Sequence, residues 1–554
     1  MPVTPDQLAE AILAAATTVL TRQGADISVL PAEGSVERPK VPDHGDYSST
    51  IALQIAKKAG LRPRELAEAI AGELTADPAI TKAEIAGPGF INVWLTPAAA
   101  GAVAGVIVGR QAAYAHGSGL AGQHVNLEFV SANPTGPIHL GGVRWAAVGD
   151  ALSRLLRSQG AGVTTEYYFN DAGAQIDRFG ESLLAAASGE PVPDGGYAGE
   201  YIQEIARAVI DMHPGVLSEP PARALEIFRS EGIALMFAEI KSSLADFGVQ
   251  FDVYFAERSL HERGELDAAL VTLRESGHAY EADGATWVRT TDYGDDKDRV
   301  YVRSNGEFTY FAADCAYYLD KRRRGADKVM IVLGADHHGY VGRLRAMARC
   351  LGDDPDETLE ILIGQLVNLV RAGQPVRMSK RAGNVVTIDD IVGAIGVDAT
   401  RYALARYSLD TTIDLDLDLW TQRGNDNPVY YVQYAHARIC SLMRAAAAAG
   451  ITLGDGYDAS LLSHDRENDL LKVLAEFPAV VADAARLRQP HRVARYLEGL
   501  AGTYHRFYDA CRVLPLRGES FSELGRARLW VADATRIVLA AGLDLLGVSA
   551  PDKL

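Results

Sequence analysis

The sequence predicts an α/β protein in which a doubly wound parallel sheet lies between a small N-terminal α/β unit and a C-terminal all-α bundle. Two apolar runs, which start near residues 125 and 328, support the sheet, because a glycine-containing loop and a helical pattern follow each of them. A third observation supports the bundle. Strand signals fade after about Ile395, and Ala-, Leu- and Arg-rich helical patterns continue to the end. At roughly 150 residues per domain, 554 residues fit three or four domains.

The N-terminal unit is expected at residues 1–110. Helical spacing covers residues 5–21 and 51–74, and a strand-like segment at 89–95 follows a Gly-Pro turn. These mixed signals predict a small α/β unit that packs around its own core.

The central unit is expected at residues 111–395 and opens with a strand–loop–helix–strand pattern. The strand at 125–130 leads into a loop at 131–142 that is rich in Gly and Pro. A helix at 143–159 and a β-branched, aromatic strand at 163–169 follow. This is a βαβ unit, which predicts a Rossmann-type sheet.

The second half of the sheet is expected from the strand at 328–333, a helix that begins near Tyr340, and a strand-like stretch at 359–370. A polar region near 189–249 looks inserted between the two halves. Residues 396–554 form the expected helical bundle.

The composition is that of an ordinary soluble protein, with 48% hydrophobic and 23% charged residues. Its four cysteines are far apart and form no CxxC pair, which argues against a thiolate zinc site and a disulfide framework and predicts the cytoplasm. No secretory signal or membrane span is expected. The net charge of −18 argues against nucleic-acid binding, but local charge matters more. The basic cluster at 321–324 is most simply a solvated helix face.

The first chemical motif is SANPTGPIHLGG at residues 131–142, where a strand passes into a helix. Open α/β sheets bind ligands at this edge, and a helix N-terminus offers N–H groups to phosphate. Its glycines let the backbone approach a nucleotide closely. His139 can donate to a phosphate oxygen on which charge develops.

The second motif is RMSKRAGN at residues 377–384, within a loop flanked by glycines. Lys380 can neutralise pyrophosphate as it leaves, and Ser379 can donate a hydrogen bond to it. A basic loop of this kind is suited to close over bound phosphates.

Together the two motifs resemble the HIGH and KMSKS signatures of class I aminoacyl-tRNA synthetases. Further segments resemble the arginyl-tRNA synthetase family along the whole chain. They are HGDY at 44–47, GPGFIN at 87–92, EFVSANPTGP at 128–137, FDVYFAERSL at 251–260, TYFAADCAY at 309–317, DATRYAL at 398–404 and NPVYYVQYAHAR at 427–438.

The chemistry of the matched segments agrees with arginine as substrate. A guanidinium needs planar carboxylate partners, and Glu128 and Asp314 lie in the two segments that the family uses for its substrate. Tyr310, four residues before Asp314, would share its helix face and, with Asn133, complete the hydrogen bonding. Such a pocket rejects uncharged amino acids, so proofreading should be unnecessary.

The resemblance implies that the protein activates L-arginine with ATP and Mg²⁺ and transfers it to the 3′ adenosine of tRNA(Arg), with activation dependent on bound tRNA. It implies a monomer and no tightly bound metal. The implied catalytic residues are His139, Lys380 and Ser379. The implied ATP-binding residues are Asn133, Gly136, His139, Gly141, Gly142, Met378 and Lys380. The implied arginine-binding residues are Glu128, Ser131, Asn133, Tyr310, Asp314 and His337, and those for tRNA are Tyr430, Gln433, Tyr434 and Arg438.

Three positions depart from the family pattern. Gly142 stands where many relatives have histidine, Arg377 replaces the first lysine of the second signature, and His337 stands where a glutamine often holds arginine. The alternatives are a synthetase for cysteine or glutamate, a non-catalytic tRNA-binding paralogue, and a nucleotidyltransferase that makes an acyl-adenylate without tRNA. The missing thiolate ligands argue against a cysteine enzyme, and the carboxylates of the pocket argue against a glutamate enzyme. The retained His139 and Lys380 argue against a non-catalytic paralogue, and the helical C-terminal third argues against a nucleotidyltransferase.

Overall fold

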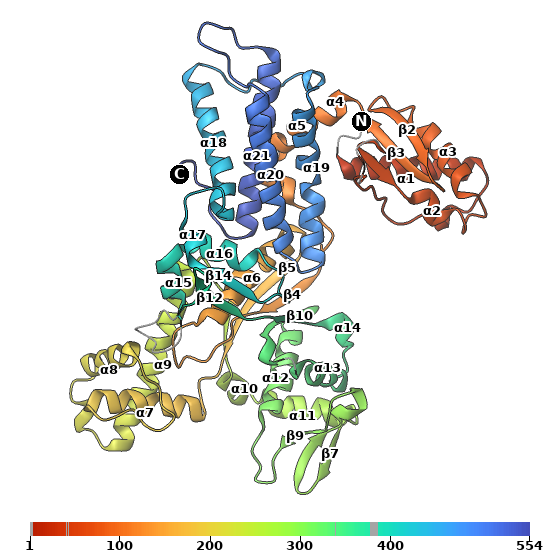
Figure 1. Cartoon of the computed structure of the whole chain (residues 1–554). Coiled ribbons are helices and arrows are strands. Elements are labelled where there is room, and N and C mark those ends of the chain that lie inside the picture. The colour runs from red at the N-terminus through yellow and green to blue at the C-terminus, as the bar shows by residue number, and fades with distance from the viewer. Residues whose placement is uncertain (1–3, 40, 42–43, 338, 377–385) are drawn as a thin grey trace.

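The computed structural model describes the whole chain except residues 1–3, 40, 42–43, 338 and 377–385 (Figure 1). A long helical bundle stands on one side of a central parallel sheet, and two lobes extend from the other side. The N-terminal unit lies beside the bundle. The predicted α/β fold class with a helical C-terminal domain is confirmed.

The N-terminal unit packs helices on a three-stranded antiparallel sheet of order β1-β3-β2. Its elements are α1 (Pro5–Arg22), β1 (Tyr47–Ser49), α2 (Ile51–Ile55), α3 (Pro63–Leu74), β2 (Ile80–Ala86) and β3 (Phe90–Leu95). The helix expected at 51–74 is broken into two. The first part, α2, ends at Ile55 and a turn follows, in which Gly60 has a left-handed backbone (φ +70°); Pro63 begins the second part because its fixed φ suits a first helical position.

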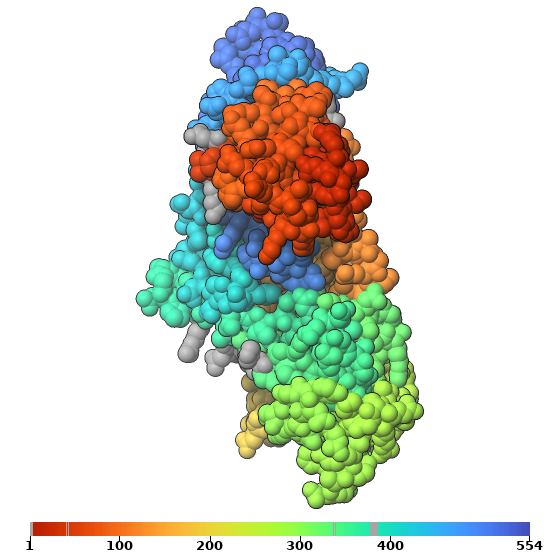
Figure 2. Space-filling model, turned by 90° about the vertical axis from the view of Figure 1, so that its right-hand side faces the viewer, coloured from red at the N-terminus to blue at the C-terminus, as the bar shows by residue number. Residues whose placement is uncertain are grey.

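The next two helices, α4 (Pro97–Gly101) and α5 (Val103–Arg110), leave this unit and pack against the bundle. The Tyr457 hydroxyl ties them down, because it donates to the Gly101 carbonyl at 2.6 Å and accepts the Gly105 N–H at 3.0 Å. Figure 2 shows the N-terminal unit covering one face of the bundle. Two ion pairs hold it there, Arg38–Glu476 at 2.9 Å and Lys472–Asp46 at 2.7 Å.

The central sheet has five parallel strands in the order β11-β10-β4-β5-β6. The strands are β4 (His124–Glu128), β5 (Gly162–Phe169), β6 (Val253–Ala256), β10 (Lys328–Gly334) and β11 (Leu359–Gly364). Helix α6 (Leu140–Ser158) crosses from β4 to β5 and is buried along most of its length. The chain order reverses between β4 and β10, so the ends of these strands form the crevice in which such sheets bind ligands.

The two lobes come from long connections after β5 and β6. The first lobe is helical, with α7 (Ala174–Ser188), α8 (Glu200–Met212) and α9 (Pro221–Asp246). The second contains α10 (Arg258–Glu262), α11 (Glu265–Glu275), an antiparallel sheet of β7 (Ala279–Ala282), β8 (Ala285–Val288) and β9 (Arg299–Val302), then α12 (Tyr310–Arg323). Helices α13 (Tyr340–Cys350) and α14 (Pro355–Thr358) precede β11.

The strand-like stretch at 359–370 divides between two sheets. β11 joins the central sheet, whereas β12 (Val367–Arg371) pairs with β13 (Gln374–Pro375) and β14 (Ile413–Asp416). β11 ends at Gly364, where a Cβ atom would lie 2.0 Å from the Trp145 ring. The expectation that strands end before residue 395 is wrong at β14, which has only four residues and gains its stability from parallel pairing with β12.

The C-terminal part begins with α15 (Ile388–Ile395), α16 (Val397–Ala405) and α17 (Leu417–Thr421). The bundle consists of α18 (Pro428–Ala448), α19 (Asp465–Arg486), α20 (His491–Ala510) and α21 (Glu523–Leu545). Short 3₁₀ segments lie at Ile27–Val29 (η1), Gln111–Ala115 (η3), Val216–Ser218 (η4), Thr290–Tyr293 (η5), Ala335–His337 (η6) and Ala459–Leu461 (η7). Among the helices that the structure describes, none has the length and apolar character needed to cross a membrane.

The fully buried guanidinium of Arg401 on α16 joins the bundle to the sheet domain. It contacts the Asp150 carboxylate on α6 and donates to the Phe247 carbonyl after α9 at 2.9 Å and the Leu546 carbonyl after α21 at 3.3 Å. Segments from three parts of the chain therefore meet on one side chain.

Candidate active site

The loop between β4 and α6 lines a cavity of about 630 Å³ at the carboxyl end of the central strands. The first motif contributes most of its wall, and Leu333 and Gly334 at the end of β10, with His337 after it, close the opposite side. Tyr197 and Tyr201 of the helical lobe complete the lining. The cavity therefore lies at the crevice predicted from the strand order.

The backbone of this loop is strained where it leaves β4. Val130 (φ +68°) and Ser131 (φ +40°) both adopt left-handed conformations, which are rare for residues other than glycine, above all for a β-branched one. The following strand holds the loop in place, because Ser131 Oγ accepts the Tyr168 N–H at 3.1 Å and Asn133 Oδ1 accepts the Asn170 N–H at 3.0 Å. Strain that is held in this way is typical of binding sites.

His139 is the N-cap residue of α6, and its exposed side chain lines the cavity together with Gly136. The segment that follows the second motif pairs with the first motif here. The Leu140 N–H donates to the Val386 carbonyl, and the Ile388 N–H donates to the Ile138 carbonyl, both at 2.9 Å. The chain just after the second motif is therefore bonded to the first. Met378, Ser379 and Lys380 themselves, like Arg377, lie outside the described residues.

Two glycines of the first motif have no room for side chains. A Cβ atom on Gly142 would lie 2.9 Å from Ile138 Cγ2, and one on Gly141 would lie 3.1 Å from the His139 ring. Gly142 is buried in the first turn of α6, so the departure from histidine at this position matches the local packing.

Three carboxylates from three elements form an acidic cluster beside the end of the sheet. Asp314 comes from α12, Glu128 from the end of β4 and Glu257 from the residue after β6. Burial, above all, raises the pKa of Asp314 to about 7; Arg343 opposes the shift, and Glu257 and Glu128 add to it. A half-buried carboxyl crowded by like charges is prepared for a cationic ligand.

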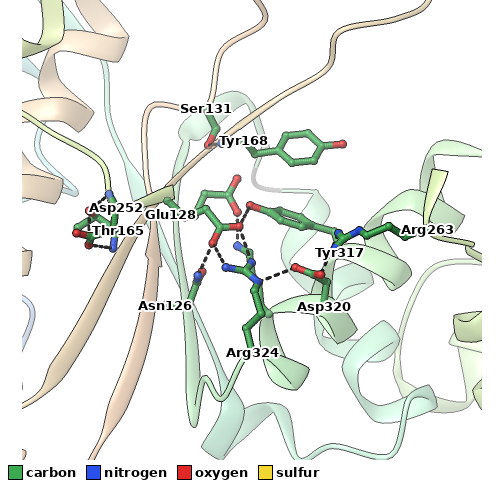
Figure 3. Close-up of polar contacts among 12 residues, drawn as sticks. Asn126, Glu128, Ser131, Thr165, Tyr168, Asp252, Arg263, Tyr317, Asp320 and Arg324 are labelled. Carbon is green, nitrogen blue, oxygen red and sulfur yellow. Dashed lines mark hydrogen bonds and ion pairs between the residues drawn. The ribbon is translucent and has the colours of Figure 1, made fainter. Parts of the chain in front are cut away.

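The members of the cluster are positioned by neighbouring side chains. The Tyr168 hydroxyl donates to Glu257 Oε2, and the Lys321 ammonium contacts Glu128 Oε2. Figure 3 shows Ser131, Tyr168 and Glu128 on adjacent segments that face α12. Tyr310 is 71% exposed at the start of α12, so its ring covers the rim of this region rather than its floor.

The remaining predicted residues of the first motif and of η6 lie around the cavity. Asn133 Nδ2 donates to Gln175 Oε1 at 2.7 Å, and the exposed His337 ring lies 5.6 Å from that of Tyr340. Glu257, Gln175 and Lys321 were not predicted as site residues from the sequence. Glu257 had a usable signal, since a carboxylate directly after an apolar strand lies at the ligand-binding edge of a parallel sheet. Gln175 and Lys321 had none, because their roles depend on contacts across the fold.

The four residues predicted to bind tRNA divide into two groups on α18. The rings of Tyr430 and Tyr434 stack at 6.2 Å, Tyr434 lies 5.7 Å from His505, and the Arg438 guanidinium lies 3.9 Å from the Tyr508 ring centroid. Gln433 is instead buried. Its Nε2 donates to Asp398 Oδ2 at 2.8 Å and to the Ser549 carbonyl at 2.9 Å, which docks the C-terminal tail.

A grouping with metal-ligand chemistry occurs between the same helix and the C-terminal tail. His436, Cys440 and Asp552 place ligand atoms within 4.8 Å of one another. The thiol donates to Asp552 Oδ1 at 3.3 Å, and His436 Nδ1 bonds to the Pro551 carbonyl at 3.0 Å. We interpret these contacts as further docking of the tail.

Comparisons with known proteins agree with this arrangement of parts. Residues 6–95 match the model of the arginyl tRNA synthetase N terminal domain, residues 234–405 match that of the class I (R) tRNA synthetase catalytic domain, and residues 432–554 match that of the DALR anticodon binding domain. An arginine–tRNA ligase from Kineococcus radiotolerans is 58% identical over 556 residues, which cover the full length of both chains. The chain belongs to the arginyl-tRNA synthetase family.

Solved structures support the same assignment. A Campylobacter jejuni structure that carries the name arginyl t-RNA synthetase has a TM-score of 0.76 at 34% identity and covers 83% of this chain and all of its own. The Thermus thermophilus arginyl-tRNA synthetase has a TM-score of 0.75 at 22% identity over 99% of this chain and all of its own, which shows a shared fold. As an arginyl-tRNA synthetase, the protein is a class I ligase that uses ATP to join arginine to tRNA(Arg).

Proposed function

We propose that the cavity beside the first motif binds ATP and that the acidic cluster next to it binds the arginine substrate. The observation that carries this division is the position of Asp314 beside Glu128 and Glu257, at the end of the strand that leads into the nucleotide loop. Carboxylates match a guanidinium or an α-ammonium group, whereas a helix N-terminus matches phosphate. The two chemistries lie side by side, as adenylate formation requires.

On the nucleotide side, we assign the triphosphate to His139, the backbone around Gly136, Gly141 and Gly142, and the three residues Met378, Ser379 and Lys380 of the second motif. His139 is supported by its exposed position at the cavity and the N-terminus of α6. The bonds from the first motif to Val386 and Ile388, which follow the second motif in the chain, support a role for Lys380 close to the same phosphates. Mg²⁺ would accompany ATP and offset charge on the phosphates, with no protein ligand assigned.

On the amino-acid side, we assign Asp314, Glu128 and Glu257 to the cationic groups of arginine, and the polar rim to Ser131, Asn133, Tyr310 and His337. The arginine carboxylate attacks the α-phosphate of ATP, and pyrophosphate leaves. A ribose hydroxyl of the terminal adenosine of tRNA then attacks the arginyl-adenylate and releases AMP. The protein contributes positioning and charge stabilisation to both steps.

We propose that tRNA contacts the aromatic face of α18 through Tyr430 and Tyr434, with Arg438 held beside them. Splayed bases stack on exposed rings, and Tyr434 is 38% exposed. Gln433 is left out of this surface because the protein itself occupies its amide. The N-terminal unit would supply a second tRNA contact. We further propose that the protein acts as a monomer in the cytoplasm, where its four buried thiols stay reduced.

The test of the amino-acid pocket compares arginine and ATP use in tRNA charging by Asp314→Asn and Glu257→Gln. We expect the KM for arginine to rise by about a hundredfold, since each variant removes a charge-assisted bidentate contact, while the KM for ATP stays within about twofold. Asp353→Asn is the control, because Asp353 bonds Tyr318 and Arg322 away from the cluster. Equal effects on both substrates, or none on arginine, would contradict the assignment.

A further inference from the structure

Lys321 on α12 is one of the most deeply buried charged side chains of the described structure, at 1% exposure. Its ammonium contacts Glu128 Oε2 and lies 4.2 Å from the Tyr317 ring centroid. The basic cluster at 321–324 was predicted to form a solvated helix face, and this prediction is wrong for Lys321. The helix buries this residue against the end of β4.

A buried ammonium needs a reason, because removing it from water costs several kcal/mol that only close pairing offsets. Lys321 is not needed to anchor α12 to the sheet, because the ion pair between Arg324 and Glu166 already does so. Glu166, the register partner of Glu128 on β5, accepts Arg324 Nη1 and Nη2 at 2.7 and 2.9 Å. It also accepts the Tyr317 hydroxyl at 2.6 Å and Asn126 Nδ2 at 2.7 Å (Figure 3).

The two pairs are therefore separate in structure. Arg324 is held on its other side by Asp320 at 2.7 Å and supplies the ion-pair hydrogen bonds to Glu166, whereas Lys321 acts on Glu166 through its charge alone. Lys321 is instead in direct contact with Glu128. The direct hydrogen bond to Glu128 is thus what this lysine contributes and Arg324 does not.

The geometry of the helix connects Lys321 to the substrate cluster. Asp314, Tyr317 and Lys321 are spaced by three and four residues, so they lie along one face of α12. The first of them contributes a carboxylate to the cluster, and the last offsets the charge of another member. Among the described residues, the hydrogen bonds to Glu128 reach only Oε2, which leaves Oε1 for a ligand.

We propose that Lys321 is a positioning residue for arginine binding. It grips Glu128 through one oxygen and offsets its charge, so that Glu128 can lie beside Asp314 and Glu257 and present its other oxygen to the substrate. This inference rests on the proposed function, because it requires Glu128 to touch arginine. Without the lysine, three like charges would share one pocket, and Glu128 would turn away or take up a proton.

The test is a double-mutant cycle of Lys321→Met and Glu128→Gln, with the KM values for arginine and for ATP measured in tRNA charging. Lys321→Met should raise the KM for arginine at least about tenfold, the loss expected for one misplaced charge-assisted hydrogen bond, with the KM for ATP within about twofold. In the Glu128→Gln background the same substitution should add less than about twofold, because its target no longer carries a charge. Lys321→Arg should recover part of the loss.

Arg324→Met is the matched control, since it loosens α12 from Glu166 without touching Glu128. If Lys321→Met does not fold, the uncharged pair Lys321→Met/Glu128→Gln is compared with Glu128→Gln alone, and equal KM values for arginine support the proposal. Additive effects, or an equal rise in Arg324→Met, would overturn it. A Glu128→Gln variant with unchanged arginine use would instead overturn the role of Glu128 in the proposed function, and the inference with it.

Discussion

The raised pKa of Asp314 makes arginine binding depend on pH. Burial raises this pKa from 3.8 to about 7, helped by Glu257 and Glu128 and opposed by Arg343. The guanidinium or ammonium of arginine binds the ionised form, so binding displaces a proton wherever Asp314 still holds one. The carboxylate and guanidinium of free arginine titrate well outside the range from pH 6 to pH 8, and its α-ammonium group stays mostly protonated below pH 8. The change in affinity across that range is therefore set by the protein.

The magnitude follows from the value of the pKa. With a pKa of about 7, roughly one Asp314 in eleven is ionised at pH 6, so the affinity for arginine should be about tenfold weaker there than at its plateau near pH 8. The effect of rising pH on the folding stability of the free protein has the opposite sign to its effect on arginine affinity. Because the folded pKa lies above the usual 3.8, the free protein loses folding free energy as the pH rises from about 4 to about 7. Arginine should therefore stabilise the protein most above neutrality.

The assay is isothermal titration of the protein with arginine between pH 5.5 and pH 8.5, in two buffers that differ in ionisation enthalpy. We expect close to one proton to be released per arginine at pH 6 and almost none at pH 8.5. Asp314→Asn binds arginine more weakly at every pH and should lose the proton release. A pH-independent affinity in the parent protein, or a proton release that survives in Asp314→Asn, would refute the reasoning.

Two further predictions concern the bundle. Arg401→Met should lower the free energy of unfolding by about 3–5 kcal/mol, because it leaves buried Asp150 and two carbonyls without this partner. Arg22→Met, which removes an exposed pair with Glu73, should change the free energy of unfolding by less than about 0.5 kcal/mol. Urea denaturation compares the two variants, and equal midpoints would contradict the role of Arg401 in joining the bundle to the sheet domain. Tyr434→Ala should weaken tRNA binding by about 1–3 kcal/mol, the contribution of one stacked base, and should leave the KM for arginine unchanged at saturating tRNA. Filter binding measures the tRNA affinity, and an unaltered affinity would remove Tyr434 from the proposed surface.

Much of the site could be predicted because local sequence determines it. The glycines, prolines and His139 of the first motif follow one another along the chain, so their place between a strand and a helix is readable from the pattern alone. Asp314 was predictable for a similar reason, since it lies within a helix in a segment that resembles the family. Glu257 was missed although its strand ends one residue before it, because its partner Tyr168 comes from another strand.

Other features were not predictable, because they depend on pairing between distant segments. The second part of the stretch at 359–370 became β12, and its partner β14 starts more than forty residues later. Helix α5 lies with the bundle rather than with the N-terminal sheet because Tyr457 bonds Gly101 at the end of α4 and Gly105 within α5. In each case the deciding contact joins residues that no local period relates.

The sequence by itself determined the class of the protein: the order of strands and helices, the two phosphate motifs and the carboxylates suited to arginine. Only the tertiary structure decided how each charge is used. Lys321 and Arg324 lie three residues apart in one basic run, yet one is buried against Glu128 and the other grips Glu166. From composition alone, both residues would be taken as charges on the surface. Desolvation and pairing, which depend on what lies across the fold, separate a positioning residue from an anchor.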